Sequence, residues 1–139
     1  MWTCFDQLPE PRAAAHRARA LVREGGLLVV RVPNGGVWAR LRTHLHGAAS
    51  RVARLVLAHN NLLGFPYRHG FTMPALARLL DATGWRVERV VGDTLVPLSD
   101  EWTRGWAAWE ERLAKATLRA VGRARPEAAP WLEVYARAK

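Results

Sequence analysis

One histidine of this sequence stands in a loop beside other side chains that could take part in chemistry. Tyr67, Arg68 and His69 follow one another directly ahead of a predicted helix. An imidazole in such a place can act as a general base or orient a substrate, because its pKa lies near neutrality. We therefore take His69 as the candidate catalytic residue and Tyr67 and Arg68 as candidate substrate-binding residues. The competing interpretation is a solvated or helix-capping loop histidine.

Three more polar residues come directly after predicted strands. Asn34 follows the apolar run at 27–32, and Asp6 and Gln7 follow a predicted strand fragment at 2–5. Open α/β sheets bind ligands just beyond the carboxyl ends of their strands, so Asn34 is a candidate for substrate binding. Asn and Asp are also common turn residues, and simple turn chemistry is the competing interpretation for Asn34 and Asp6.

The elements that must position these residues alternate between helix and strand. Residues 27–32 are apolar and rich in β-branched side chains, which is typical of a strand covered on both faces. Gly25 before this run suits the end of a helix. Residues 85–91 and 131–137 alternate between apolar and polar side chains, which predicts two further strands. With the fragment at 2–5, the sequence predicts an α/β fold: a partial Rossmann-like open sheet of about four strands flanked by helices.

The helices are marked by their ends. Thr72 is a good N-cap and Gly84 a good stop for a helix between them. Residues 37–61 predict one or two helices, and residues 99–123 predict a long helix capped by Ser99. We expect a single domain over 1–139, with helical insertions at about 37–61 and 99–123.

The long predicted helix contains an apolar stripe at helical spacing. We expect this stripe to be part of the core, and an aromatic pocket for a substrate is the alternative. The residues of the stripe are Trp102, Trp106, Trp109, Leu113 and Ala116.

The segment 37–61 has a basic side as well as an apolar one. A packed helix pair is the expected structure, and a helix lying on a membrane surface or forming a lid over the substrate is the alternative.

Composition restricts the classes of function. The formal net charge is +9, and all but two of the 21 basic residues are arginines. The arginines are dispersed and accompany no nucleic-acid-binding signature, so we interpret them as a compositional bias and expect no nucleic-acid partner. The single cysteine excludes an internal disulfide and a cysteine-rich metal site, which favours a cytoplasmic location and no metal. Apolar runs are far shorter than the roughly 20 residues of a membrane span, and no secretory signal is visible.

Two blocks of the sequence resemble class I S-adenosylmethionine (SAM)-dependent methyltransferases. The first resembles the segment in which a D-x-L-x-x-P loop is followed by a helix, a glycine pair, a strand and Pro-Asn. The second resembles the family's H-x-F-T segment with its following helix and strand. The blocks are Phe5-Asp6-Gln7-Leu8-Pro9-Glu10-Pro11 with Glu24-Gly25-Gly26-Leu27-Leu28-Val29-Val30-Arg31-Val32-Pro33-Asn34, and Arg68-His69-Gly70-Phe71-Thr72 with Leu76, Leu79-Leu80 and Gly84-Trp85-Arg86-Val87.

The resemblance covers nearly the whole sequence and matches the second half of the family's domain. It implies methyl transfer to a small-molecule acceptor, a final strand that runs antiparallel, and a cofactor pocket lined by Asp6 and Gln7. It also places His69 and Asn34 near the active-site side. The family binds SAM mainly through a glycine-rich G-x-G-x-G turn and a following acidic residue, and these 139 residues contain no such turn. The resemblance therefore predicts a truncated methyltransferase that binds SAM weakly or not at all by itself.

Two alternatives remain open at this point. The chain could be one half of a split methyltransferase, in which an exposed sheet edge near residues 2–5 pairs with a cofactor-binding chain or a second copy. It could instead be a non-catalytic basic module that binds an acidic partner.

Overall fold

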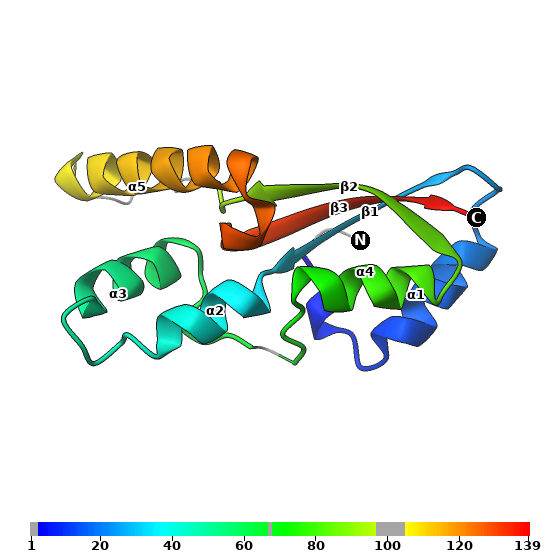
Figure 1. Cartoon of the computed structure of the whole chain (residues 1–139), viewed down its shortest axis with the longest axis horizontal. Coiled ribbons are helices and arrows are strands. Elements are labelled where there is room, and N and C mark those ends of the chain that lie inside the picture. Colours follow the sequence, from blue (N-terminus) through cyan, green and yellow to red (C-terminus); the bar gives the residue numbers. More distant parts are fainter. Residues whose placement is uncertain (1–2, 67, 97–104) are drawn as a thin grey trace.

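The computed structural model describes residues 3–66, 68–96 and 105–139 and contains one three-stranded sheet. The strands are β1 (Leu27–Pro33), β2 (Trp85–Asp93) and β3 (Trp131–Ala138), in the order β1-β3-β2. The last strand, β3, lies in the middle and runs antiparallel to both neighbours (Figure 1). The α/β class and the antiparallel final strand are confirmed.

The prediction of about four strands is wrong. Residues Phe5–Gln7 form a short 3-10 helix instead of continuing a strand. Thr3 has a positive φ of 53°, which is incompatible with an extended strand, although its N–H donates to the Arg31 carbonyl of β1 at 3.1 Å. Trp2 lies outside the described residues.

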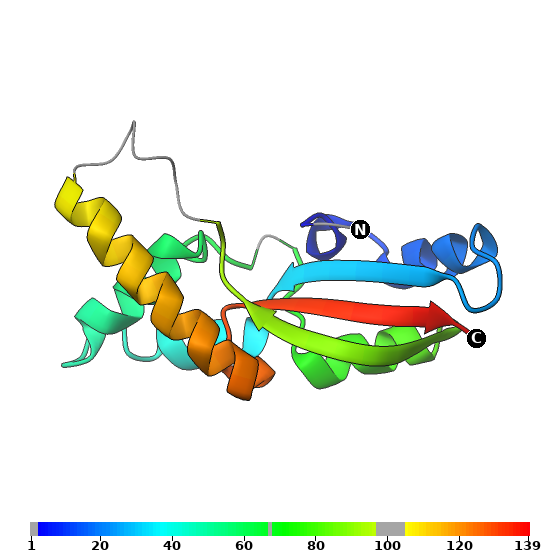
Figure 2. The same ribbon diagram turned by 90° about the horizontal axis from the view of Figure 1, so that it is seen from above.

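Two helices cover one face of the sheet, α1 (Pro11–Ala20) and α4 (Met73–Asp81) (Figures 1 and 2). As predicted, the Thr72 hydroxyl caps α4 by accepting from the N–H of Ala75, and Gly84 adopts a positive φ of 86° after it. The main core lies between these helices and the sheet. Its fully buried side chains include Phe5, Val30, Val32, Leu76, Leu80, Trp85 and Leu132.

Three further helices gather at the other end of the molecule: α2 (Gly35–Arg42), α3 (Ser50–His59) and α5 (Gly105–Ala124) (Figures 1 and 2). The sequence predicted one or two helices in the segment 37–61, and the structure has two. A second apolar cluster packs α2, α3 and the segment after α3 against the start of β3. It consists of Leu57, Leu62, Phe65 and Trp131.

The apolar stripe of α5 faces solvent. Trp106 and Trp109 are each 67% exposed and Leu113 is 53% exposed, and Ala116 is exposed as well. We call Trp106, Trp109 and Leu113 the α5 stripe. The prediction that these side chains belong to the core is wrong. Trp102 and Ser99 lie outside the described residues.

The face of α5 that is buried explains this orientation. It contains the small residues Ala108 and Gly122 together with the ion pair of Glu111 and Lys115. Gly122 lies so close to β2 that a Cβ added at Gly92 would sit 2.7 Å from the Gly122 carbonyl oxygen. Only a side of the helix without bulky side chains can approach the strand in this way, so the tryptophans are turned outward.

Candidate functional site

The two sequence blocks that resemble a methyltransferase meet beyond the carboxyl end of β1. The backbone N–H of His69 donates to the Asp6 carbonyl at 3.0 Å, and the His69 ring Nε2 contacts the Leu8 carbonyl at 3.0 Å. The rings of Phe5 and Phe71 pack with centroids 5.6 Å apart. Segments some 60 residues apart in the sequence therefore form one junction, and it includes two predicted site residues, Asp6 and His69.

A glycine joins this junction to the end of β1. The N–H of Gly35 donates to the Phe71 carbonyl at 2.8 Å. A Cβ on Gly35 would lie 2.7 Å from the carbonyl carbon and oxygen of Gly70, a distance that real Cβ atoms do not adopt. The backbone of the His69 loop thus lies directly against the first turn of α2 because position 35 has no side chain.

Asn34 is a structural residue in the described chain. Its Oδ1 accepts from the N–H groups of Gly36 (3.0 Å) and Val37 (3.4 Å), which makes it the N-cap of α2. Its Nδ2 donates to the carbonyls of Glu127 (3.1 Å) and Ala129 (2.9 Å). The side chain is 98% buried, with each donor and acceptor already used, so turn chemistry accounts for Asn34 and a substrate contact stays a prediction.

The geometry of His69 defines which ring nitrogen can act as a base. A backbone carbonyl only accepts, so Nε2 carries the proton in its contact with the Leu8 carbonyl. In the neutral ring Nδ1 is then the nitrogen that can accept a proton. The ring is half-buried and lies 5.8 Å from that of Phe71, which restricts its orientation.

Asp6 is a buried carboxylate, and neither of its side-chain oxygens has a hydrogen-bond partner among the residues that the structure describes. It is 1% exposed. Burial raises the pKa of Asp6, while its own backbone N–H and the nearby His69 lower it to a smaller extent. An unsatisfied buried carboxylate costs folding free energy, and such costs are typical of functional positions. Asp6 is therefore the residue at this junction with an unused capacity to accept hydrogen bonds from a ligand.

Replacing Asp6 by Asn is expected to stabilise the chain at pH 7 by about 1–3 kcal/mol. With a raised folded-state pKa, the folded protein binds more protons than the unfolded chain between the ordinary value of 3.8 and that raised pKa. The stability of the native chain therefore falls as the pH rises through this window and stays lower above it. Urea denaturation at several pH values should show the gain of Asp6→Asn near neutrality and its loss below about pH 4.

The exposed Asp81, which pairs with Lys139 at 2.6 Å, provides the matched control for this test. Asp81→Asn is expected to change stability by no more than about 0.5 kcal/mol. A lower stability of Asp6→Asn at pH 7 would mean that the carboxylate is stabilised in the native state.

The other predicted site residues are placed as follows. Gln7 and Arg68 are exposed, and the Gln7 side chain donates to the Thr3 carbonyl at 3.4 Å. Tyr67 lies outside the described residues. The structure thus brings together Asp6 and His69 and leaves Arg68 at the surface of the same loop.

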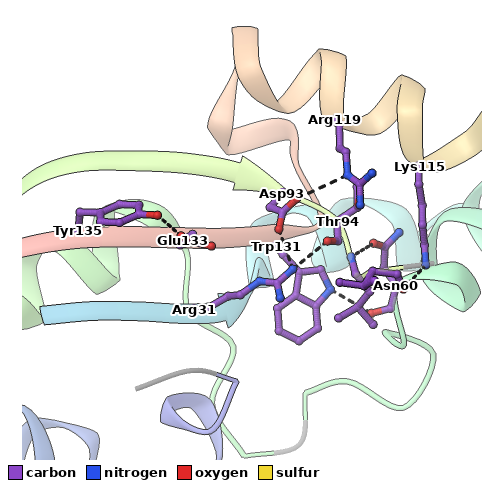
Figure 3. A network of polar contacts seen from close by, with 11 residues as sticks. Arg31, Asn60, Asp93, Thr94, Lys115, Arg119, Trp131, Glu133 and Tyr135 are labelled. Carbon is purple, nitrogen blue, oxygen red and sulfur yellow. Dashed lines mark hydrogen bonds and ion pairs between the residues drawn. The ribbon is translucent and has the colours of Figure 1, made fainter. Parts of the chain in front are cut away.

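A second polar cluster lies beside α5, where β1 and β2 end and β3 begins, and no sequence motif predicted it (Figure 3). The buried Arg31 guanidinium donates to Asp93 at 2.7 Å and to the Thr94 carbonyl at 2.8 Å, and it lies over the Trp131 ring at 5.4 Å. Arg119 of α5 reaches the same Asp93 at 3.8 Å. The visible signal was an arginine inside an apolar strand, which requires a buried partner.

Further contacts in this cluster hold the segment after β2. Asn60 accepts from the Leu95 N–H at 3.1 Å, and its carbonyl accepts from the Trp131 indole N–H at 3.1 Å. Lys115 donates to the Val96 carbonyl at 3.0 Å (Figure 3). It also pairs with Glu111. These contacts fix α5 and the segment after β2 against the sheet. Among the described residues of this cluster, the buried Thr94 hydroxyl has no hydrogen-bond partner.

Comparisons with known proteins add little to this geometry. No protein-family model matches the sequence, and the search of curated proteins gave no match. Among solved structures, the chain is similar to the plantazolicin methyltransferase BamL, whose crystal structure holds a triazolic desmethylPZN analogue and SAH. The TM-score is 0.49 at 14% identity, over 99% of this chain and 51% of that one, so the chain spans about half the length of this methyltransferase. A likeness at this level assigns neither a family nor an activity.

Proposed function

We propose that these 139 residues form the acceptor-side part of a class I SAM-dependent methyltransferase that acts on a small molecule. The observation that carries the proposal is the junction of the two sequence blocks. Asp6 and His69 are brought into backbone contact at 3.0 Å beyond the end of β1, where α/β sheets bind their ligands. A packed arrangement of the two motifs in one place is what a shared site requires.

The proposed chemistry depends mainly on positioning. The cofactor supplies a methyl group on a sulfonium, and transfer needs the acceptor atom held in line with it in a site that excludes water. His69 would accept the acceptor's proton at Nδ1, since Nε2 is engaged by the Leu8 carbonyl. The partnerless Asp6 oxygens would accept hydrogen bonds from the cofactor or the acceptor and hold it in place.

The residues present do not fit the cofactor as a whole. The sequence contains no G-x-G-x-G turn that could approach the methionine end of SAM closely. The cofactor-binding part must therefore come from residues outside these 139, in the same chain or in a partner. Pairing with a second copy or a complementing chain was expected at a sheet edge near residues 2–5, and it stays a prediction. Residues Phe5–Gln7 form a 3-10 helix, so the edge strand on this side of the sheet is β1.

Calorimetric titration of SAM and of S-adenosylhomocysteine into the purified 139-residue chain tests whether these residues bind the cofactor without the missing part. We expect no binding tighter than about 1 mM, because Asp6 and His69 cannot replace the contacts of a glycine-rich turn. A micromolar dissociation constant for the isolated chain would contradict the proposal.

The complementary experiment examines the natural reading frame and its immediate neighbours. One of them is expected to encode a strand followed by a glycine-rich turn and a helix, and the product that contains both parts should bind SAM in the micromolar range. If no such turn is encoded there, the basic-module alternative gains support and the methyltransferase assignment loses its cofactor site.

A further inference from the structure

We propose that the end of the molecule formed by α3 and α5 binds the surface of an anionic lipid bilayer, with the α5 stripe in the interfacial layer. The proposal does not depend on the methyltransferase assignment. It starts from the fact that Trp106 and Trp109 are each 67% exposed and Leu113 is 53% exposed on one face of α5. Their spacing of three and four residues makes this face a continuous apolar ridge.

Exposed apolar side chains are concentrated at this end of the molecule. Nine large apolar side chains are exposed within the ranges that the structure describes, and seven of them lie on or beside α3 and α5. Besides the α5 stripe they include Val52 on α3, which is 64% exposed, and Val96, which is 71% exposed. The other two are Leu21, directly after α1, and Leu27, at the start of β1. The segment that joins these two elements lies at the opposite end of the molecule (Figure 1). Such a concentration marks an interaction surface.

The same end carries most of the formal net positive charge. Helices α2, α3 and α5 contain eight Arg or Lys residues and two Glu residues, and no acidic residue occurs anywhere between Glu24 and Asp81. Of the two glutamates, Glu111 pairs with Lys115 and Glu110 lies 3.6 Å from His59. A cationic surface with interfacial tryptophans is the combination that anionic bilayers attract.

The packing of α5 shows that this orientation is built in. The helix buries the Glu111–Lys115 pair and leaves two tryptophans in water, which is the reverse of the usual preference. Arg119 and Lys115 tie the helix to Asp93 and to the Val96 carbonyl, so α5 cannot rotate its stripe inward without breaking these contacts. The apolar periodicity of α5 would normally face the core, and here the fold exposes it. Such a disagreement between sequence pattern and fold is expected where a surface has a function.

The shape and charge favour a bilayer over other occupants. Helix α5 lies at the outer edge of the molecule (Figures 1 and 2). The exposed side chains of the α5 stripe can therefore enter the headgroup layer. Two copies with a formal net charge of +9 each repel each other, which disfavours a second copy of the chain as the occupant. None of the helices among the described residues is long and apolar enough to cross a membrane.

The test measures binding of the 139-residue chain to vesicles by flotation. We expect the chain to bind vesicles that contain phosphatidylglycerol and to bind pure phosphatidylcholine vesicles more weakly. Binding to the anionic vesicles should fall as the salt concentration rises. The double variant Trp106→Ser/Trp109→Ser should lower partitioning at least about tenfold, because its apolar insertion is lost. The matched control is Leu21→Ser, an 87% exposed apolar residue at the opposite end, which should bind like the native chain.

A second pair of variants shows whether vesicle binding depends on where the positive charge lies or only on the net charge of the chain. Arg51→Glu/Arg123→Glu changes exposed residues on α3 and α5, and Arg12→Glu/Arg23→Glu changes exposed residues on and after α1 by the same net charge. The first pair should weaken binding about tenfold more than the second.

Three results would overturn the proposal: no binding to anionic vesicles, binding that does not depend on Trp106 and Trp109, or equal effects of the two charge pairs. A concentration-dependent dimer that is lost in the tryptophan double variant, without vesicle binding, would assign the surface to self-association instead. All substituted residues are exposed, and circular dichroism checks that each variant is folded.

Discussion

Replacing Lys115 by Met is expected to lower the free energy of unfolding by about 3–5 kcal/mol. Lys115 is 1% exposed and Glu111 is 3% exposed, and the ammonium is held by Glu111 and by the Val96 carbonyl at 3.0 Å. Removing the lysine takes the Lys115 ammonium away from the buried Glu111 carboxylate, which is the costly change. Urea denaturation followed by far-UV circular dichroism measures the loss.

The double variant Lys115→Met/Glu111→Leu shows whether the loss comes from the buried Glu111 charge that remains. Two apolar side chains of similar volume remove both charges, so this variant should be as stable as the native chain or more so by about 1–4 kcal/mol. Arg123→Met, an exposed position on the same helix, should change stability by less than about 0.5 kcal/mol. If Lys115→Met is as stable as the native chain, the pair is not buried in solution and the orientation of α5 is wrong.

Replacing Trp85 by Ala is expected to cost about 3–5 kcal/mol. Trp85 begins β2, is fully buried between the sheet and the covering helices, and donates from its indole N–H to the Ala15 carbonyl of α1 at 3.0 Å. The alanine variant loses this apolar contact and leaves a cavity that the surrounding helices cannot fill. The midpoint of urea denaturation should shift accordingly.

Two further variants separate the contributions at this position. Trp85→Phe retains most of the apolar volume and loses the hydrogen bond, so its cost should be smaller, about 1–3 kcal/mol. Trp106→Ala removes an exposed tryptophan and should leave stability almost unchanged. Equal costs for Trp85→Ala and Trp106→Ala would show that the two tryptophans are equally buried, contrary to the structure.

Local signals were sufficient for most of the sheet. The apolar run at 27–32, the alternation at 85–91 and that at 131–137 became strands within two residues of their predicted ends. The cap at Thr72 and the stop at Gly84 were also correct. These features depend on neighbours in the sequence, since a cap, a turn or an alternating strand is determined by a few consecutive residues.

Part of the candidate site could also be predicted from local sequence motifs. Motif order indicated that Asp6 and His69 belong to one region, and the backbone contact between them agrees with this expectation. The sequence could not reveal that Asn34 has all its hydrogen-bonding groups occupied by Glu127, Ala129 and the start of α2, because those partners come from segments far along the chain.

The orientation of α5 about its axis shows most clearly what the sequence alone could not predict. Periodicity identified a helix with one apolar face, and by itself it determined which residues share that face. Which face is buried was decided by the close approach of Gly92 and Gly122 and by the pairing of Lys115 and Glu111. Periodicity describes a single element, whereas burial is a property of the surfaces that meet it. The sequence therefore determined the strands, the caps and the junction motifs, and only the tertiary structure decided that Trp106, Trp109 and Leu113 face outward.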